Sequence, residues 1–371
     1  MMKKLFTLFL SAVMLLTACV SLIGCGGHTH TYGEWIKNET HHWKECTDAE
    51  CNEKSDYGTH SFNNGACVCG AKTVTIKTVS SNIDESKSLN EVKAGTSDVA
   101  IVDEFIYKHY STSRSICEGL SVLDIAGVES PVQQFRFITR KDSNIDDYFN
   151  AALYKLQEEG IRVEIRGEEK VWTLSELAAK YNLNDLLIEI PEPTVNLDDP
   201  IDPDSDLYTM LQAGIAKIHF ADPSGKQWLE PLGWQTHAGV EGFMFYVAQA
   251  ALKELGLNVY QSMIPGENAD WSAIYQVNYT EDFTDFQIIC GMITDDITYY
   301  DPLAEETVAI TDMFDLSVPF MSNRQVLVTK AEKVATYNSL ASLASATIVT
   351  EANFAGYAFA NNQLKNAILG A

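Results

Sequence analysis

The segment Leu89-Asn-Glu-Val-Lys-Ala-Gly-Thr-Ser-Asp-Val-Ala-Ile-Val-Asp103 combines a helix pattern with the pattern of a buried strand. Residues 89–95 predict a short helix that ends at the glycine. Residues 98–103 predict a buried strand with an acid at its end, and the alternating segment 73–79 predicts an earlier strand. A strand, a helix and another strand in succession indicate an α/β fold.

The same alternation continues along the rest of the chain. Strands are expected at 135–139 and 215–220, and helices at 144–159, 174–181 and 240–255. Between these groups, residues 191–206 hold four prolines and six acids in 16 positions without any hydrophobic period. That composition predicts an extended linker.

Length and charge restrict the function classes. The 371 residues suffice for two lobes and a small extra module. The net charge of −25 argues against a nucleic-acid-binding protein, because such proteins need a basic surface. The acidic surface instead favours solubility and attraction of cations.

The N-terminus resembles a targeting segment. Lys3 and Lys4 precede an apolar run over 5–23, and Leu22-Ile23-Gly24-Cys25 has the form of a lipobox. Residues 1–24 are therefore expected to be a lipoprotein signal peptide, with Cys25 lipidated and the protein held on the extracellular face of the cell membrane. Cys19, in Leu16-Thr17-Ala18-Cys19, is the alternative lipidation site, and an uncleaved membrane anchor is the other alternative.

Residues 25–72 form a Cys/His-rich module. The segment is too short to bury enough apolar surface by itself, and a tetrahedral zinc ion would supply the missing stability. His41-His-Trp-Lys-Glu-Cys46 resembles small Cys/His repeats of bacterial surface proteins. Two disulfides or a flexible tether are the alternatives. The zinc ligands expected from the spacing are Cys46, Cys51, Cys67 and Cys69, with His60 able to replace one of them.

Several segments of the chain resemble the solute-binding proteins of amino-acid ABC importers, which have the type II periplasmic-binding-protein fold. Besides 89–103, they are Phe135-Arg-Phe-Ile-Thr-Arg-Lys-Asp142, Asp285-Phe-Gln-Ile-Ile-Cys-Gly-Met-Ile-Thr294, Phe314-Asp-Leu-Ser-Val-Pro-Phe320 and Asn323-Arg-Gln-Val-Leu-Val-Thr-Lys330. The segments occur in rotated order, since 207–371 resembles the beginning of such a protein and 73–190 its end. The resemblance implies a two-lobed, circularly permuted fold in which 191–206 joins the former ends.

The resemblance also implies the domain limits. An ordinary interdomain linker between two unrelated partial domains is the alternative. In the permuted arrangement, the parts are lobe one at 207–324, the first part of lobe two at 325–371, the second part of lobe two at 73–134, the hinge return with the closing helices of lobe one at 135–190, and the linker at 191–206.

The site implied by the resemblance lies between the lobes, at the carboxyl ends of strands. Asp103 stands where the family places its acceptor for a ligand ammonium group. No arginine follows Thr294, where the family has its carboxylate clamp, and Asp295 follows instead. An amine-bearing or neutral solute is therefore expected. The other candidate ligand residues are Glu351, Asn353, Trp228, Trp234, Tyr299 and Arg324, with Arg114 as a second replacement clamp.

The expected function is capture of a small polar solute for an ABC permease, by a monomer without chemistry of its own. An enzyme is disfavoured because the sequence has neither G-x-S-x-G nor H-E-x-x-H. A degenerate surface protein without a ligand, or a binding protein that signals without transport, are the remaining alternatives. No cofactor besides the structural zinc is expected.

Overall fold

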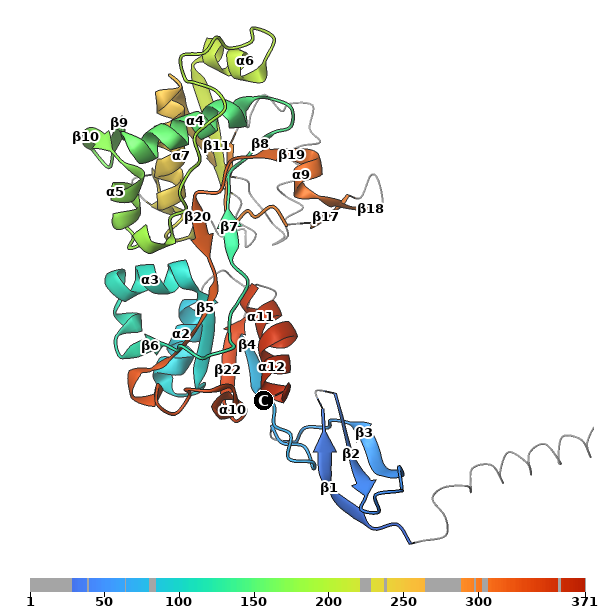
Figure 1. Ribbon diagram of the computed structural model, residues 1–371. Helices are drawn as coiled ribbons and strands as arrows, with labels where there is room; N and C mark the ends of the chain where they lie inside the picture. Colours follow the sequence, from blue (N-terminus) through green and yellow to red (C-terminus); the bar gives the residue numbers. More distant parts are fainter. Residues whose placement is uncertain are drawn as a thin grey trace, which may run out of the picture.

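A computed structural model of the chain contains two α/β units and a small N-terminal module (Figure 1). The structure describes residues 29–38, 40–63, 65–79, 85–220, 228–236, 239–263, 288–296, 298–301, 306–352 and 355–370. The predicted signal peptide, Cys19, Cys25 and Asn353 lie outside these residues. Among the described helices, none has the length and apolar character needed to cross a bilayer.

Unit II, which comprises residues 73–132 and 324–370, is built on a mixed five-stranded sheet of order β4-β22-β5-β21-β6. β4, β22 and β5 are mutually parallel, whereas β21 runs antiparallel to β5 and β6. The strands are β4 (Thr75–Val79), β5 (Val99–Asp103), β6 (Leu120–Val122), β21 (Gln325–Lys330) and β22 (Thr347–Glu351). The helices are α2 (Ser86–Ala94), α3 (Glu104–Ser113), η2 (Ser115–Cys117), η5 (Ala331–Lys333), α10 (Leu340–Leu343), α11 (Ala355–Phe359), η6 (Ala360–Leu364) and α12 (Lys365–Gly370).

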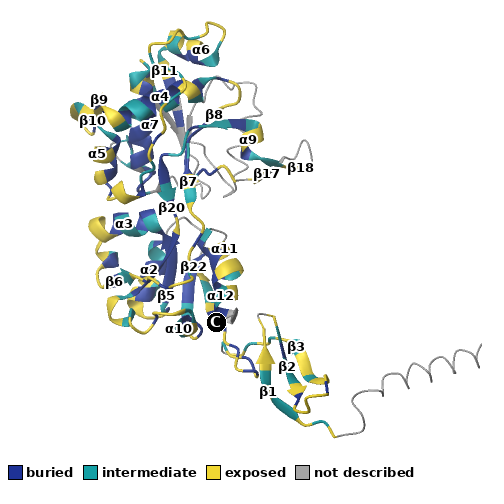
Figure 2. Cartoon of the chain, viewed as in Figure 1, coloured by how far each residue is buried: buried dark blue, intermediate teal, exposed yellow. Residues whose placement is uncertain are grey.

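Three adjacent strands of unit II bring together distant parts of the sequence. β22 lies between β4 and β5, although it is far from both in sequence: the Thr347 N–H donates to Asp98, 249 positions earlier, at 2.9 Å. All five residues of β5 are buried, as the continuous apolar run Val99–Val102 predicts for a strand covered on both faces. Figure 2 shows β5 and β22 at the buried centre of this unit.

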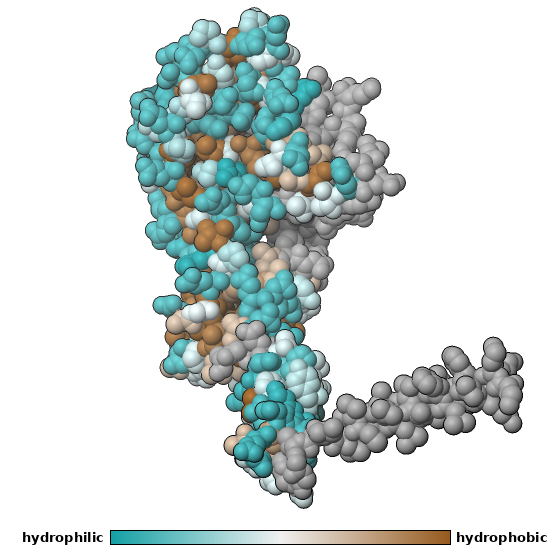
Figure 3. All heavy atoms as spheres, turned by 45° about the vertical axis from the view of Figure 1, so that its right-hand side comes forward, coloured by the Kyte–Doolittle hydropathy of each residue, from teal (hydrophilic) through white to brown (hydrophobic). Residues whose placement is uncertain are grey.

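Unit I, residues 136–320, has a second mixed five-stranded sheet of order β15-β11-β16-β8-β19. Its sheet strands are β8 (Ile138–Arg140), β11 (Ile215–Phe220), β15 (Asn258–Met263), β16 (Ile288–Cys290) and β19 (Phe314–Leu316). Around it lie α4 (Ile145–Glu158), β9 (Ile161–Ile165), β10 (Glu168–Trp172), α5 (Leu174–Ala179), η3 (Asn184–Leu186), α6 (Asp206–Ala213), β12 (Trp228–Leu229), β13 (Gly233–Thr236), β14 (Gly239–Glu241), α7 (Phe243–Glu254), β17 (Thr298–Asp301), β18 (Glu306–Ala309) and α9 (Ile310–Met313). In Figure 3 its surface is mostly hydrophilic with scattered hydrophobic side chains.

Two antiparallel strands, β7 (Gln133–Phe135) and β20 (Met321–Asn323), pass between the units (Figure 1). The single strand expected at 135–139 is therefore two strands, β7 and β8. Arg136 and Phe137 separate them, because their N–H groups donate to Ile293 O at 2.9 Å and to Ser317 Oγ at 2.9 Å. Each crossing strand leads directly into a sheet, β7 into β8 and β20 into β21.

The predicted linker lies against unit I. Residues 191–205 contain neither helix nor strand, as their proline content predicts. Val195, Leu197 and Ile201 pack against the core, and the Tyr148 hydroxyl donates to Pro200 O at 3.2 Å. The segment is thus attached along its length rather than extended into solvent.

The N-terminal module holds a three-stranded antiparallel sheet of β1 (Tyr32–Lys37), β2 (His41–Cys46) and β3 (Lys54–Thr59). Its apolar core is small: Cys67, Cys69 and Ala71 are buried, with Trp35 and Phe62 packed against them. Such a core stabilises a module of this size only weakly.

Candidate functional site

Carboxyl groups gather at the carboxyl end of the unit II sheet. Because β4, β22 and β5 are parallel, their carboxyl ends share one edge, and β20 enters unit II at that edge through β21. Asp103 is the last residue of β5, Glu351 is the last residue of β22, and Glu85 stands at the start of α2. All three side chains are buried, with 8%, 2% and 6% of the residue exposed. Burying a carboxyl group without hydrogen-bond partners costs free energy, so the partners of these three groups determine which charge the edge can carry.

Asp103 is bound by two side-chain amides from the far end of the chain. Asn323 Nδ2 donates to Asp103 Oδ1 at 2.6 Å, and Gln325 Nε2 donates to the same oxygen at 2.5 Å. Asn323 is the last residue of the crossing strand β20, and Gln325 is the first residue of β21. Neutral amides orient the carboxylate without neutralising it. Among the described residues, no lysine or arginine forms an ion pair with Asp103.

Glu85 is the second member of a carboxyl pair. Its Oε2 accepts the Asp103 backbone N–H at 2.8 Å. Burial, and then the nearby charge of Asp103, raise the pKa of Glu85 well above its usual range. Burial also raises the pKa of Asp103, while the amides and a hydrogen bond from Glu85 oppose that increase. The two carboxyl groups therefore titrate as a coupled pair, in which the protonated form is favoured more strongly at Glu85 than at Asp103.

One buried acceptor beside this pair has no partner. Gln325 Oε1 makes no hydrogen bond within the described part of the chain, although the residue is only 6% exposed. An orphaned buried acceptor costs free energy, and a ligand N–H group would satisfy it. The edge thus offers a carboxylate charge and a free acceptor, which together suit a ligand that carries several N–H donors.

Replacing Glu85 by glutamine is expected to change the pH dependence of stability. A carboxyl group whose native pKa is raised stabilises the fold below its unfolded pKa of about 4.3, and this contribution is lost as the pH rises toward the native pKa. The glutamine amide would mimic the protonated acid at every pH. The melting temperature of Glu85→Gln, relative to that of the original chain, should rise as the pH increases above about 4. The exposed Glu332→Gln variant is the control for loss of one acid, and a melting difference for Glu85→Gln that does not change with pH would contradict the raised pKa of Glu85.

On the unit I side of the crossing, an arginine lies beside the turn that follows β16. Arg136 donates from one terminal nitrogen to Asp295 Oδ2 at 3.0 Å, and from the other to Ser317 O at 3.0 Å. Its Nε is buried without a partner among the described residues. Thr294 Oγ1 donates to the Asp296 carboxylate instead. No arginine follows Thr294 along the chain, but the guanidinium of Arg136, between β7 and β8, lies beside this turn.

Sequence inspection missed Arg136 because it lies far from Thr294 along the chain. One signal was present: Arg136 stands between Phe135 and Phe137, both fully buried, in a segment expected to be a strand. Neighbouring residues in a strand point to opposite faces, so an arginine between two core phenylalanines points away from that core.

Both arginines considered as replacement clamps are paired with carboxylates. Arg324 Nε donates to Glu104 Oε2 at 2.8 Å, and Arg114 donates to Glu230. Glu230 also meets His109 Nε2 at 2.9 Å, so that helix α3 of unit II contacts unit I through this residue. Arg114 and Arg324 thus serve as ion-pair partners, one between the units and one inside unit II.

Three aromatic residues, Trp228, Trp234 and Tyr299, are also expected to contact the ligand. Trp234 is partly buried and packs edge-on against Tyr181, with ring centroids 5.9 Å apart, in unit I. Trp228 lies in β12 and Tyr299 in β17, and their side chains are outside the described part of the structure. The structure brings together Asp103 and Glu351 on one edge, and Thr294 and Asp295 on the turn of unit I.

The cysteines and histidines of the N-terminal module form two groups rather than one. His42, His60, Cys67 and Cys69 make the first, and His30, Cys46 and Cys51 make the second. Within each group, the potential ligand atoms all lie within 4.8 Å of one another. The four cysteines expected at one zinc ion are thus divided between the groups, and His60 belongs with Cys67 and Cys69. Either group could hold a metal ion.

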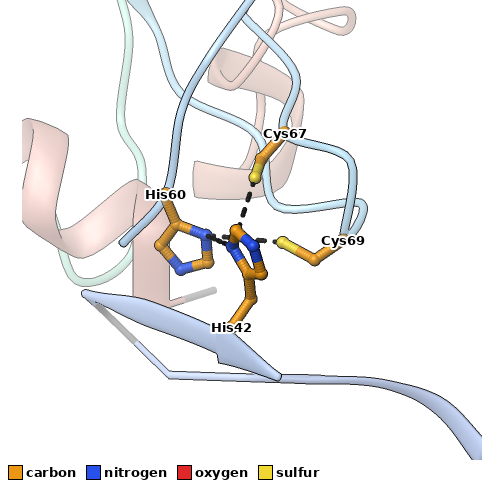
Figure 4. A group of neighbouring side chains, drawn as sticks. All are labelled: His42, His60, Cys67 and Cys69. Carbon is orange, nitrogen blue, oxygen red and sulfur yellow. Dashed lines mark hydrogen bonds between the residues drawn. The ribbon is translucent and has the colours of Figure 1, made fainter. Parts of the chain in front are cut away.

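Figure 4 shows the first group converging on a common centre. The Nδ1 atoms of His42 and His60 are 3.4 Å apart, Cys67 Sγ is 3.5 Å from His42 Nδ1, and Cys69 Sγ is 3.4 Å from His60 Nδ1. Burial alone would raise the pKa of Cys67, but backbone N–H groups and His60 lower it to about 6. No disulfide links the six cysteines that the structure describes.

Comparison with known proteins finds only remote similarities to solved structures. No family model matches the chain, and no curated protein matches its sequence. Two similar solved structures are a substrate binding protein from Microbacterium hydrocarbonoxydans complexed with 4-hydroxybenzoate hydrazide (13% identity, TM-score 0.25) and NikA from Staphylococcus aureus in complex with Ni(L-His)2 (9% identity, TM-score 0.27). Each match covers 71% of this chain and 46% of the other.

Proposed function

We propose that this chain is an extracytoplasmic solute-binding lipoprotein with a circularly permuted type II binding-protein fold. It captures a small polar, amine-bearing solute between its two units and delivers it to an ABC permease. The observation that carries the proposal is the buried pair Asp103–Glu85 with the unpartnered Gln325 Oε1, at the carboxyl edge of a parallel strand group. Ligand sites of α/β sheets lie at such edges.

The arrangement of the two sheets supports the permuted fold. In each sheet, three neighbouring parallel strands are followed by an antiparallel strand that continues directly from a crossing strand, β8 in unit I and β21 in unit II. In unit II, β22 (347–351) lies between β4 (75–79) and β5 (99–103). A strand late in the sequence is therefore inserted between two early ones, as a permuted chain order predicts. A link through residues 191–206, attached along unit I, fits former termini that lay on one lobe.

The charge of the edge supports an amine-bearing ligand. The protonated form is favoured most at Glu85, and the other side-chain donors to Asp103 among the described residues are the neutral amides of Asn323 and Gln325. A ligand ammonium group would supply the missing counter-charge, and buried charges are stable only when paired. Arg136, held by Asp295 and Ser317 O, provides a donor at the opposite side of the crossing with its Nε still unpartnered.

The two crossing strands, β7 and β20, would act as the hinge about which the two units close on a ligand. β7 and β20 are three residues each and pair with one another, so bending at their ends moves the units as bodies. The expected anchor at Cys25 would keep the monomer at the membrane face near its permease.

A melting panel tests this proposal on the full chain in detergent. Amino acids, polyamines, quaternary amines and short peptides are each added at increasing concentration. A ligand present at about 100 times its dissociation constant should stabilise the fold by roughly 2.7 kcal/mol, which for a protein of this size raises the melting temperature by a few degrees. Primary amines should give the largest shifts. A panel without any shift would contradict solute binding and favour a degenerate surface protein.

A further inference from the structure

We propose that the N-terminal module holds two separate zinc ions, one at His42, His60, Cys67 and Cys69 and the other at His30, Cys46 and Cys51. The inference concerns residues outside the solute site and is independent of the proposed transport function. It rests on ligand spacing, on the hydrogen bonding behind the ligands, and on the length of strand β2.

The spacing of the first group is that of a zinc tetrahedron. Zinc binds thiolate sulfur at about 2.3 Å and imidazole nitrogen at about 2.0–2.1 Å, so a tetrahedral ion separates its N and S ligands by about 3.5 Å and two N ligands by about 3.4 Å. The observed N–S distances are 3.5 and 3.4 Å, and the N–N distance is 3.4 Å. Two cysteines and two histidines complete the four positions, which is the usual set of a closed structural site.

The groups behind these ligands support the same assignment. His60 Nε2 lies 2.8 Å from Asn38 O, so the ring donates its Nε2 proton there and leaves Nδ1 as the free acceptor on the ligand side. Around Cys67 the chain forms a tight turn, with the Cys67 N–H bonded to Ala71 O at 2.7 Å and the Gly70 N–H bonded to Cys67 O at 2.9 Å. Gly70 has a φ of 79°, which a residue with a side chain rarely adopts, and the turn brings Cys69 back toward Cys67.

Strand β2 excludes a single ion shared by all the ligands. His42 and Cys46 are both buried on β2 and are four positions apart. An extended strand rises about 3.3 Å per residue, so these positions are about 13 Å apart. Ligand atoms of one tetrahedral zinc ion lie within about 4 Å of one another. The strand therefore separates two centres, with one ligand of each at its two ends.

The second group has three ligands from the described residues. His30 Nδ1 lies 3.4 Å from Cys51 Sγ, again the N–S separation of a common ion. The Cys51 N–H bonds to Asp48 O at 3.0 Å, which turns the chain after β2 so that Cys51 returns to Cys46. Water, or a ligand from outside the described residues, would take the fourth position.

Two ions would supply the stability that the small apolar core lacks. The buried core of the module is Cys67, Cys69 and Ala71, so most of its interior consists of potential ligands. Zinc binding releases free energy directly into folding for modules of this kind. Each ion would fix one end of β2 to a different loop, 48–51 at one end and 60–69 at the other.

Metal analysis of the full chain, purified in detergent without chelators, tests the inference. Two zinc ions per chain are expected. Cys67→Ser/Cys69→Ser should retain one ion, and Cys46→Ser/Cys51→Ser should also retain one. Cys117→Ser is the matched control and should retain both, because burial raises the pKa of this thiol to about 11 and it lies outside the module.

Two further variants separate a ligand role from a structural one. His60→Ala should lose the first ion, whereas His60→Cys should keep it, since three cysteines and one histidine also form a zinc site. After cobalt replacement, the thiolate absorption of the two double-cysteine variants should sum to that of the original chain. The proposal would be overturned if the original chain bound only one zinc ion and each double-cysteine variant lost it. Absence of metal together with four fewer titratable thiols than in the reduced chain would overturn it in favour of two disulfides.

Discussion

Asp103→Asn is expected to weaken binding of the best amine from the melting panel by about 2–5 kcal/mol, or about 30-fold to several thousand-fold in dissociation constant. The substitution removes the charge but keeps Oδ1, which accepts from both Asn323 and Gln325. The folded structure should therefore persist. Removal of the Asp103 charge also removes one cause of the raised pKa of Glu85, so the melting temperature of the variant is measured together with its binding.

Titration calorimetry of Asp103→Asn and Glu332→Gln measures this effect. Glu332 is an exposed acid in η5, at the opposite end of β21, and its replacement changes the net charge by the same one unit. The control should bind as the original chain does. An Asp103→Asn variant that binds the amine within about threefold of the original would show that the ammonium group does not sit at this carboxylate, whatever the melting panel finds.

Gly242→Ala is expected to destabilise unit I by about 4 kcal/mol or more, which ranks among the largest single-residue effects. Gly242 precedes α7 with a φ of 138° and a ψ of 158°, a region essentially reserved for glycine. A Cβ placed there would come within 2.4 Å of Leu232 O and 2.5 Å of Gly233 Cα. Neither backbone atom can yield easily, because the neighbouring N–H groups of Phe243 and Met244 donate to Pro231 O and Leu232 O.

Gly256→Ala is the matched control for this substitution. Gly256, just after α7, also has a positive φ of 83°, but no atom lies within 4 Å of the position of its Cβ. Only backbone strain of about 1–2 kcal/mol is expected there. Urea unfolding followed by circular dichroism gives both free energies of unfolding. Equal losses in the two variants would mean that the close approach at Gly242 relaxes and that conformational strain alone remains.

The regular elements were predictable because their signals are local. The strand expected at 215–220 has those bounds, and the helix expected at 144–159 spans Ile145–Glu158. In both, the hydrophobic period within a few turns or residues determines the element. The strand expected at 135–139 was wrong at its centre, because two hydrogen bonds to distant parts of unit I interrupt it.

A site residue could be predicted from the sequence only where its own helix or strand indicates its position. Asp103 follows from its place at the end of a buried strand. Glu85 and Gln325 could not be inferred, since both reach Asp103 only through the folding of the chain. In the N-terminal module, cysteine spacing suggested one group of four. The separation into two groups depends on β2 lying extended between His42 and Cys46, which cysteine spacing does not encode.

The interleaving of β22 between β4 and β5 has a consequence for how the polypeptide is made. During synthesis, residues 75–103 emerge long before residues 347–351, and the two edges that β22 joins stay without their partner until the last part of the chain is made. Pairing over such a sequence distance is slow, and uncovered strand edges are prone to association with other chains. A truncated chain that ends before Thr347 would lack β22 and would leave β4 and β5 without the strand that joins them.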